Sequence, residues 1–270
     1  MDIAAPAHDA PPAQVTLPSR GRMRAEVWIV LGLSLGQTAV YAAIRLIERY
    51  MSSTPISGQT TTLNPSRSSI DVIDLIRQLL SIGFALVPVA LALYLLSQHG
   101  VSSRVRLGLV GPARRWWGDV GWGMILAASI GLPGLALYAI SRALGQTVTI
   151  DTSGLPSAWW SATILLLSAA AAGVLEEFVV VGFVLTRLRD LGRSPWTAII
   201  LAALLRGGYH LYQGWPMALG NVAMGLVFGF MYVRRGRLAP LVIAHWTIDA
   251  VSFIGPEVVP HAWLVSLGVA

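Results

Sequence analysis

Seven apolar stretches divide this chain, and each is long enough to cross a lipid bilayer. A transmembrane helix needs about 20 mostly apolar residues, because the hydrocarbon core is about 30 Å thick. Backbone groups in lipid must satisfy their own hydrogen bonds, which leaves helices as the natural spanning element for such stretches. We therefore predict an all-α polytopic membrane protein, a bundle of about seven transmembrane helices. The predicted spans are 26–48, 75–97, 118–143, 157–187, 195–212, 216–233 and 238–255.

The composition agrees with this prediction and excludes several classes of function. Hydrophobic residues make up 55% of the chain and charged residues 12%, against roughly 25% charged in an ordinary soluble domain. The chain has no cysteine, so disulfides and zinc–thiolate sites are excluded. The net charge of +6 does not indicate nucleic-acid binding, because in a membrane protein the position of each arginine matters more than the sum. The expected partner is the lipid bilayer.

The arginines predict an orientation. They precede the first span and fill the loops after the second, fourth and sixth spans, whereas three of the four alternate segments have none. The exception is the segment after the first span, which holds Arg67. The positive-inside rule then predicts a cytoplasmic N-terminus and a C-terminus outside. We expect a multi-pass protein of a bacterial plasma membrane.

Four regions follow from this division. Residues 1–24 are rich in Ala and Pro, lack the apolar core of a signal peptide, and are predicted to form a disordered cytoplasmic tail. Residues 25–156 hold the N-terminal helices and loops, including a polar connection near 50–71 that we expect to be flexible. Residues 157–255 form a helix core with unusual polar residues, and 256–270 form a short tail.

Two adjacent acids, Glu176 and Glu177, lie inside the apolar stretch LEEFVVVGF. An acid near the bilayer centre costs about 2.5–3.5 kcal/mol on insertion scales, so intramembrane acids usually serve a function. Other polar residues lie at overlapping depths, about 12–25 Å from the arginine-bearing edge by the helical rise. These residues, from three further spans, are Arg206, His210, Asn221, His245 and Asp249. Their convergence predicts a polar site within the helix bundle.

The spacing suggests how this site is arranged. Arg206 and His210 are four residues apart, as are His245 and Asp249, so each pair shares a helix face. Asp249 is expected to accept from one His245 nitrogen and fix its tautomer. The two glutamates are about 100° apart on a helix, so only one should face the site centre. The other needs a partner, such as Arg206 or a histidine.

Each residue also has a purely structural interpretation. A lone intramembrane His or Asn commonly forms a hydrogen bond between helices, and Arg206 alone would serve as a counter-ion. The glutamate pair together with two histidines and an aspartate favours a functional site. The other histidines, His8, His99 and His261, lie outside the core and are expected to be solvated or interfacial.

At these residues the sequence resembles the CPBP family, which comprises CAAX-type intramembrane endopeptidases and bacteriocin-processing or immunity (Abi) proteins. The family pattern is a Glu-Glu pair with Arg four positions after the second Glu, then aromatic-x-x-x-His, then His-x-x-x-Asn or His-x-x-x-Asp. The matching residues are Glu176, Glu177, His210, His245 and Asp249. Two positions depart from it. Val181 stands where the family has Arg, and Arg206 stands where it has the aromatic residue, so we hypothesise that Arg206 restores the missing charge.

The resemblance implies hydrolysis of a peptide bond in a membrane-embedded or lipid-anchored substrate. Glu176 would activate a water molecule, while Glu177, His210 and His245 would position it or stabilise the oxyanion. Asp249 would orient His245. Arg206 and Asn221 would be supporting residues.

Two mechanisms stay open. In the first, Glu176, Glu177, His210 and His245 hold Zn²⁺ with an open position. In the second, the glutamate acts without a metal, in keeping with the absence of an HExxH motif. The alternative function is a non-catalytic immunity or scaffolding protein that retains the polar core. A proton-relay transporter would favour an inverted repeat, which is not visible in the sequence.

Overall fold

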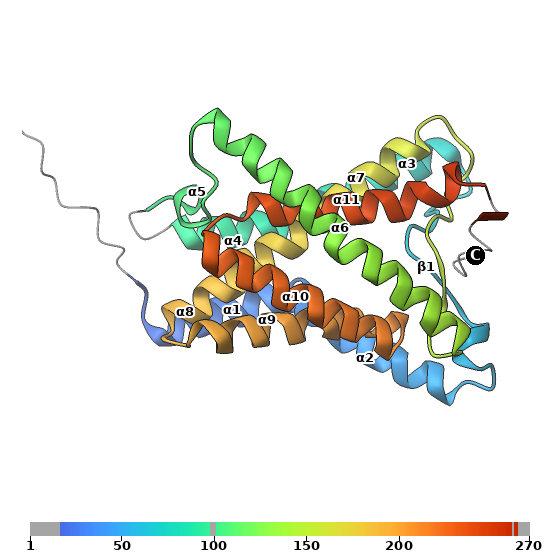
Figure 1. The fold of residues 1–270 in the computed structure, drawn as a ribbon, viewed down its shortest axis with the longest axis horizontal. Helices are drawn as coiled ribbons and strands as arrows, with labels where there is room; N and C mark the ends of the chain where they lie inside the picture. Colours follow the sequence, from blue (N-terminus) through green and yellow to red (C-terminus); the bar gives the residue numbers. More distant parts are fainter. Residues whose placement is uncertain (1–16, 98–100, 261, 264–270) are drawn as a thin grey trace, which may run out of the picture.

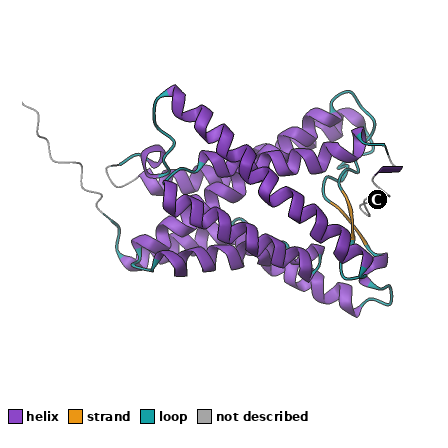
Figure 2. Cartoon of the chain, viewed as in Figure 1, coloured by secondary structure: helices purple, strands orange, loops and turns teal. Residues whose placement is uncertain are grey.

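The computed structural model describes residues 17–97, 101–260 and 262–263. It is about 76% helical and has no closed sheet, as Figures 1 and 2 show. The all-α fold class is therefore confirmed. The α-helices in the N-terminal half are α1 (Arg20–Gly32), α2 (Leu35–Met51), α3 (Asp71–Ala85), α4 (Val87–Ser97), α5 (Ser103–Arg106) and α6 (Ala113–Ala143). Those in the C-terminal half are α7 (Ser161–Glu176), α8 (Thr186–Asp190), α9 (Pro195–Tyr209), α10 (Trp215–Arg235) and α11 (Ala239–Val258), with a π-helix at Glu177–Leu185.

Helices occupy all seven of the predicted ranges, but fewer qualify as spans. By length and hydropathy, four helical segments in the described part of the chain are able to cross a membrane. These are Asp71–Ser97, Ala113–Ala143, Ser161–Asp190 and Trp215–Arg235. A fifth is added if α1 and α2, bent by 52° at their junction, form one broken span. A multi-pass membrane protein is therefore supported, while seven crossings and the orientation of the termini stay predictions.

The predicted tail boundaries are wrong at both ends. Helix α1 begins at Arg20, because the Ser19 side chain accepts a hydrogen bond from the Arg22 amide and caps the helix. Residues 20–24 are therefore helical, and residues 1–16 lie outside the described residues. Helix α11 continues to Val258, past the predicted boundary at 255. His8, His99 and His261 all lie outside the described residues.

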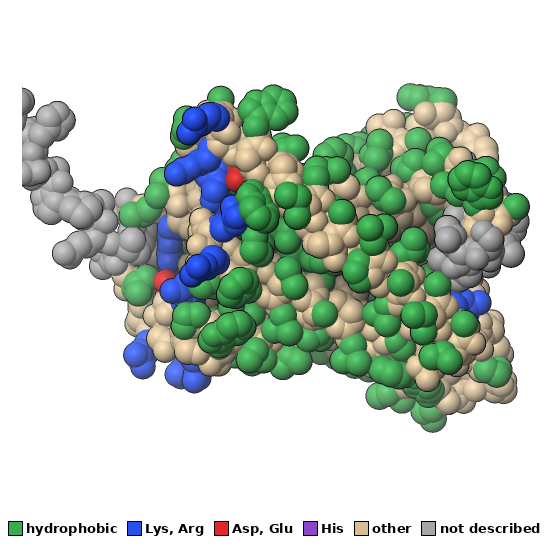
Figure 3. All heavy atoms as spheres, in the orientation of Figure 1, with side chains coloured by type: hydrophobic (Ala, Val, Ile, Leu, Met, Phe, Trp, Pro, Cys, Tyr) green, Lys and Arg blue, Asp and Glu red, His purple; other side chains and the backbone are tan. Residues whose placement is uncertain are grey.

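The two ends of the molecule differ in charge and in structure. On the face drawn in Figure 3, arginines gather at one end, next to α1, α5 and α8, which we call the Arg-rich end. At the opposite end a short parallel pair joins β1 (Thr60–Thr62) to β2 (Thr149–Asp151), in the register Thr60 with Thr149. The 50–71 connection is thus more ordered than predicted, since Arg49 also hydrogen-bonds Gln59 within it.

Close helix contacts bring the polar residues together. Helix α7 packs on α11, and α9 packs on α10. A Cβ at Gly173 would lie 3.1 Å from the backbone nitrogen of Trp246, and one at Gly225 would lie 2.8 Å from Cα of Ala203. Glycine at these two positions therefore permits the close approach of the helices that carry the candidate site.

The helix that carries the glutamates changes type within the pair. Glu176 is the last residue of α7, and Glu177 is the first residue of the π-helix. A π-helix has a wider turn than an α-helix and is often found at functional sites. All of the π-helix residues except Phe178 are buried, so the wide turn lies within the protein core.

Candidate functional site

Glu177 joins three helical segments. Its side chain is completely buried, and its Oε1 accepts a hydrogen bond from Nη2 of Arg206 in α9. The same oxygen lies 2.8 Å from Nδ1 of His245 in α11. Arg206 is also fully buried, and its guanidinium lies 5.4 Å from the ring centroid of Phe228. This pairing compensates two buried charges and holds Arg206 and His245 in fixed positions.

Glu176 is more open than Glu177. Its side chain is 12% exposed, and its Oε2 accepts a hydrogen bond of 2.8 Å from the hydroxyl of Tyr209. The same oxygen lies 3.9 Å from Nη1 of Arg206 and 3.9 Å from Nε2 of His245. Its Oε1 has no hydrogen-bond partner among the described residues. Glu176 therefore has a carboxylate oxygen available for a water molecule or a substrate.

The two glutamates reach the same partners, which corrects the prediction that only one faces the site. Glu176 and Glu177 both contact Arg206 and His245. The wider turn that starts at Glu177 rotates successive residues by less than the 100° of an α-helix. Adjacent side chains can therefore converge on one cation and one imidazole.

Both nitrogens of His245 have carboxylate neighbours. Asp249 lies 3.5 Å from Nε2, in keeping with the expectation that it pairs with one of the two nitrogens. The other nitrogen, Nδ1, was expected to be left for chemistry but contacts Glu177, and Nε2 also faces Glu176. His245 thus lies between one carboxylate on Nδ1 and two on Nε2. The side chain is 6% exposed, so these groups define its surroundings.

His210 lies at the end of α9, because this helix stops at Tyr209 rather than at residue 212. Its Nδ1 lies 3.0 Å from the carbonyl oxygen of Arg206, one turn earlier. The ring is half-buried, lies 4.8 Å from the Tyr209 ring, and interacts electrostatically with Glu176. The structure therefore brings Glu176, Glu177, His245 and Asp249 into contact and places His210 next to Tyr209, the residue that bonds Glu176.

Comparison with known families agrees with this arrangement. Residues 158–251 match the family model described as type II CAAX prenyl endopeptidase Rce1-like. Over these residues the chain is similar to this family, in keeping with the resemblance to the CPBP family noted from the sequence. Neither the curated proteins nor the solved structures contain a match to the chain. The matched range runs from just before α7 into α11, and includes every predicted site residue. Because this CPBP group is a protease family, the match indicates a peptidase at the level of broad class.

Asn221 does not join the candidate site. Its amide donates a 3.0 Å hydrogen bond to the carbonyl of Met217 in its own helix. Depth along the helix was predicted to bring it close to the glutamates, but depth does not determine what the side chain bonds. Among the described residues, Asn221 therefore makes no hydrogen bond to a candidate site residue that would support its predicted role.

Tyr209 is a site residue that the sequence analysis missed. It is buried, and its hydroxyl donates to Glu176 from the position directly before His210. The signal in the sequence was the glycine pair Gly207–Gly208 just before it, and Gly214 a few residues later, which mark the end of a helix. A helix that ends at this depth turns its last residues toward the site.

Arg206 lies beside the glutamate pair, as the hypothesis that it restores the missing charge requires. Val181 is buried among apolar residues, one turn beyond Glu177. Arg206 approaches the same glutamate from the neighbouring helix and pairs with it. The positive charge beside the glutamate pair therefore comes from α9 in this chain.

The donor set does not fit the predicted zinc site. Within the described ranges, no three His, Cys, Asp or Glu side chains are grouped so that they could hold one metal ion. Glu177 and Nδ1 of His245 contact each other, and Nδ1 of His210 faces a backbone carbonyl. Arg206 places a permanent positive charge against the same carboxylates. We therefore derive no catalytic step through a metal.

Proposed function

We propose that this protein is an intramembrane endopeptidase in which Glu176 activates a water molecule. One observation carries the proposal: Glu176 is held at Oε2 by Tyr209 while its Oε1 has no partner among the described residues. A carboxylate fixed at one oxygen and free at the other is suited to bind water and remove its proton. The match to a protease family supports the same chemistry.

The reaction would proceed in two proton transfers. Glu176 accepts a proton from water as the water oxygen attacks the carbonyl carbon of the scissile peptide. The resulting tetrahedral intermediate carries its negative charge on the former carbonyl oxygen. Glu176 then returns the proton to the amide nitrogen, the C–N bond breaks, and the products are a carboxylic acid and an amine. No oxidant or reductant takes part.

Two neighbours are suited to stabilise the oxyanion. Nη1 and Nε of Arg206 are buried and have no hydrogen-bond partner in the described part of the chain. Nε2 of His245 lies on the same side as Glu176. Donors that are fixed before the reaction lower the barrier because they do not have to reorganise. We assign Glu177 as a positioning residue, since it holds both Arg206 and His245.

The proposed substrate is a membrane-embedded or lipid-anchored peptide, and the proposed location is a bacterial plasma membrane. The site residues belong to apolar helices, so a substrate must reach them from the bilayer or its surface. Nothing in the described residues selects a prenyl group. The substrate test therefore includes anchors of several chemical types.

The decisive experiment compares the purified full-length wild type with Glu176→Gln on a library of membrane-anchored peptides, some prenylated and some not. We expect cleavage by the wild type and a loss of about 10²–10⁴-fold in the variant, the usual contribution of a general base. Thermal unfolding should be similar for the two proteins. Parallel reactions contain either a chelator or added zinc, and we expect less than a twofold change.

A non-catalytic protein would give a different result. If neither protein cleaves any peptide in any of these conditions, and Glu176→Gln is folded, then the peptidase proposal is wrong. The polar core would then serve structure or binding.

A further inference from the structure

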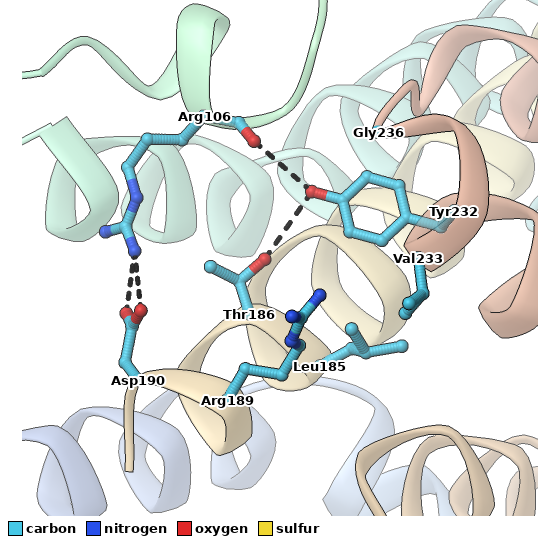
Figure 4. Close-up of a pocket in the computed structure, with 8 residues that line it drawn as sticks. All are labelled: Arg106, Leu185, Thr186, Arg189, Asp190, Tyr232, Val233 and Gly236. Atoms are coloured by element: carbon cyan, nitrogen blue, oxygen red, sulfur yellow. Dashed lines mark hydrogen bonds and ion pairs between the residues drawn. The ribbon is translucent and has the colours of Figure 1, made fainter. Parts of the chain in front are cut away.

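A second polar cavity lies away from the candidate active site, at the Arg-rich end. It has a volume of about 430 Å³, within the range of small-molecule sites, about 300–1,000 Å³. Figure 4 shows that it lies where α5, α8 and the end of α10 meet. The lining residues are Arg106, Leu185, Thr186, Arg189, Asp190, Tyr232, Val233 and Gly236.

The lining has a surplus of positive charge. Nη2 of Arg106 donates to both carboxylate oxygens of Asp190, at 2.9 and 2.7 Å, so these two charges compensate each other. Arg189 is exposed and has no ion pair or hydrogen bond with any described side chain. In Figure 4 the Arg106–Asp190 pair forms one side of the cavity and Arg189 lies on the other. One uncompensated cation therefore faces the hollow.

Two hydroxyl groups and one guanidinium nitrogen complete the polar lining. The Tyr232 hydroxyl lies 3.5 Å from the Thr186 hydroxyl and donates a 3.4 Å hydrogen bond to the carbonyl of Arg106. Nη1 of Arg106 is buried and has no hydrogen-bond partner in the described part of the chain. Hydroxyl and guanidinium groups around one cation suit an anion with several oxygens, such as a phosphate.

An apolar groove begins beside this cavity. It has a volume of about 320 Å³ and shares Val233 with the polar cavity. Its other lining residues are Pro195, Trp196, Ile199, Phe230 and Arg234. The rings of Trp196 and Phe230 stack with centroids 6.0 Å apart, and the two side chains are 60% and 44% exposed. The polar, positively charged cavity therefore adjoins an exposed aromatic surface formed by Trp196 and Phe230.

We propose that this pair of sites binds an anionic phospholipid, with the headgroup phosphate at Arg189 and an acyl chain along Trp196 and Phe230. The neighbouring apolar groove favours a lipid over a free phosphate ion, because only a lipid fills both parts. Basic pockets between helix ends near the membrane surface are a common way to bind acidic headgroups. The proposal does not depend on the peptidase activity, since no candidate active-site residue lines either site.

The test uses the full-length protein in detergent and measures the binding of phosphatidylglycerol and phosphatidylcholine by native mass spectrometry. We expect the wild type to prefer phosphatidylglycerol and Arg189→Gln to weaken its binding about tenfold, with Arg189→Lys retaining part of it. The matched control is Arg193→Gln, an exposed arginine at the same end that lines neither site. It should change binding less than twofold.

Two outcomes would overturn the proposal. Equal losses in Arg189→Gln and Arg193→Gln would mean that the general charge of this end attracts the lipid. The second outcome tests whether the bound phosphate belongs to a lipid. We expect Trp196→Ala to weaken the binding of phosphatidylglycerol. We also expect inorganic phosphate to bind far more weakly than phosphatidylglycerol at the same concentration. If inorganic phosphate binds as tightly as the lipid, and Trp196→Ala has no effect, the occupant is a free anion.

Discussion

Two buried arginines, Arg187 and Arg206, have side chains with no solvent exposure, yet their surroundings differ in a way that separates structure from function. Each one joins helices that are distant in the sequence. The Arg187 cluster comprises Arg22, Glu26, Arg106, Arg187 and Asp190. The Arg206 cluster comprises Glu176, Glu177, Arg206, His245 and Asp249.

In the Arg187 cluster every carboxylate has permanent cations as partners. Nη2 of Arg187 lies 2.7 Å from Glu26 in α1, and Nη1 lies 3.1 Å from Asp190 in α8. Nη2 also donates a 2.9 Å hydrogen bond to the carbonyl of Leu95 in α4. With Arg22 paired to Glu26 and Arg106 paired to Asp190, two carboxylates face three arginines. Such a cluster needs no proton to compensate its carboxylates, and it serves to hold helix ends together.

The Arg206 cluster is unbalanced. Three carboxylates share one permanent cation: Glu176 and Glu177 contact Arg206, and Asp249 joins the cluster through His245. Protons on histidines or carboxylates must balance the remaining negative charge, because buried charges that are unpaired are costly. A cluster that depends on protons for its neutrality can give and accept them. This difference is why we place catalysis at Arg206 and structure at Arg187.

Arg206→Leu should have the largest effect on stability and cleavage taken together. Removing the cation leaves the buried Glu177 with His245 as its remaining partner, and loss of one partner of a buried ion pair typically costs about 3–5 kcal/mol of stability. The remaining folded protein should also cleave poorly, since His245 and Glu176 lose a neighbour. Unfolding in detergent and cleavage per folded molecule measure the two effects separately. A loss no greater than that of the exposed Arg193→Leu would contradict the proposed role of Arg206.

A double variant sharpens this test. In Arg206→Leu with Glu177→Leu, both buried charges are gone, so part of the stability should return, because apolar replacements of a buried ion pair are often neutral or stabilising. Cleavage should not return, because His245 has lost the carboxylate at Nδ1.

Arg187→Leu should affect stability alone. It leaves Glu26 with Arg22 and Asp190 with Arg106 as their remaining partners, so we expect a loss of about 1.5–3 kcal/mol, the contribution of a hydrogen bond to a charged group. Cleavage per folded molecule should stay within about twofold of the wild type, because Arg187 contacts none of the candidate active-site residues. A large loss of cleavage in well-folded protein would show that the two clusters do not have separate roles.

The sequence predicted the members of the site better than their contacts. Depth along each helix placed Glu176, His245 and Asp249 together, because the helical rise is the same in every span. It could not predict that Glu177 rather than Asp249 contacts Nδ1 of His245, since that depends on the π-helix that starts at Glu177. A change of helix type has no clear signal in an apolar sequence.

The fold was predictable to a similar extent. Apolar length located the long helices, but it did not predict the short helix α5, the break between α1 and α2, or that α9 is only 15 residues long. Asn221 shows the same limit within the site, since its amide bonds its own helix despite a suitable depth. Local backbone geometry and side-chain rotamers, rather than hydrophobic length, determine these features.

Tyr209→Phe should have the smallest effect and is the most specific test of the site geometry. The change removes only the hydroxyl that donates to Oε2 of Glu176, and keeps the ring that packs beside His210. A hydrogen bond to a charged group contributes about 1.5–3 kcal/mol, so cleavage should fall by about 10- to 150-fold. Stability should change little, because Glu176 is partly exposed and water can replace the lost donor. If Tyr209→Phe cleaves as fast as the wild type, cleavage does not require the hydrogen bond at Oε2 of Glu176. The proposal that one oxygen of Glu176 is held while the other binds water would then be wrong.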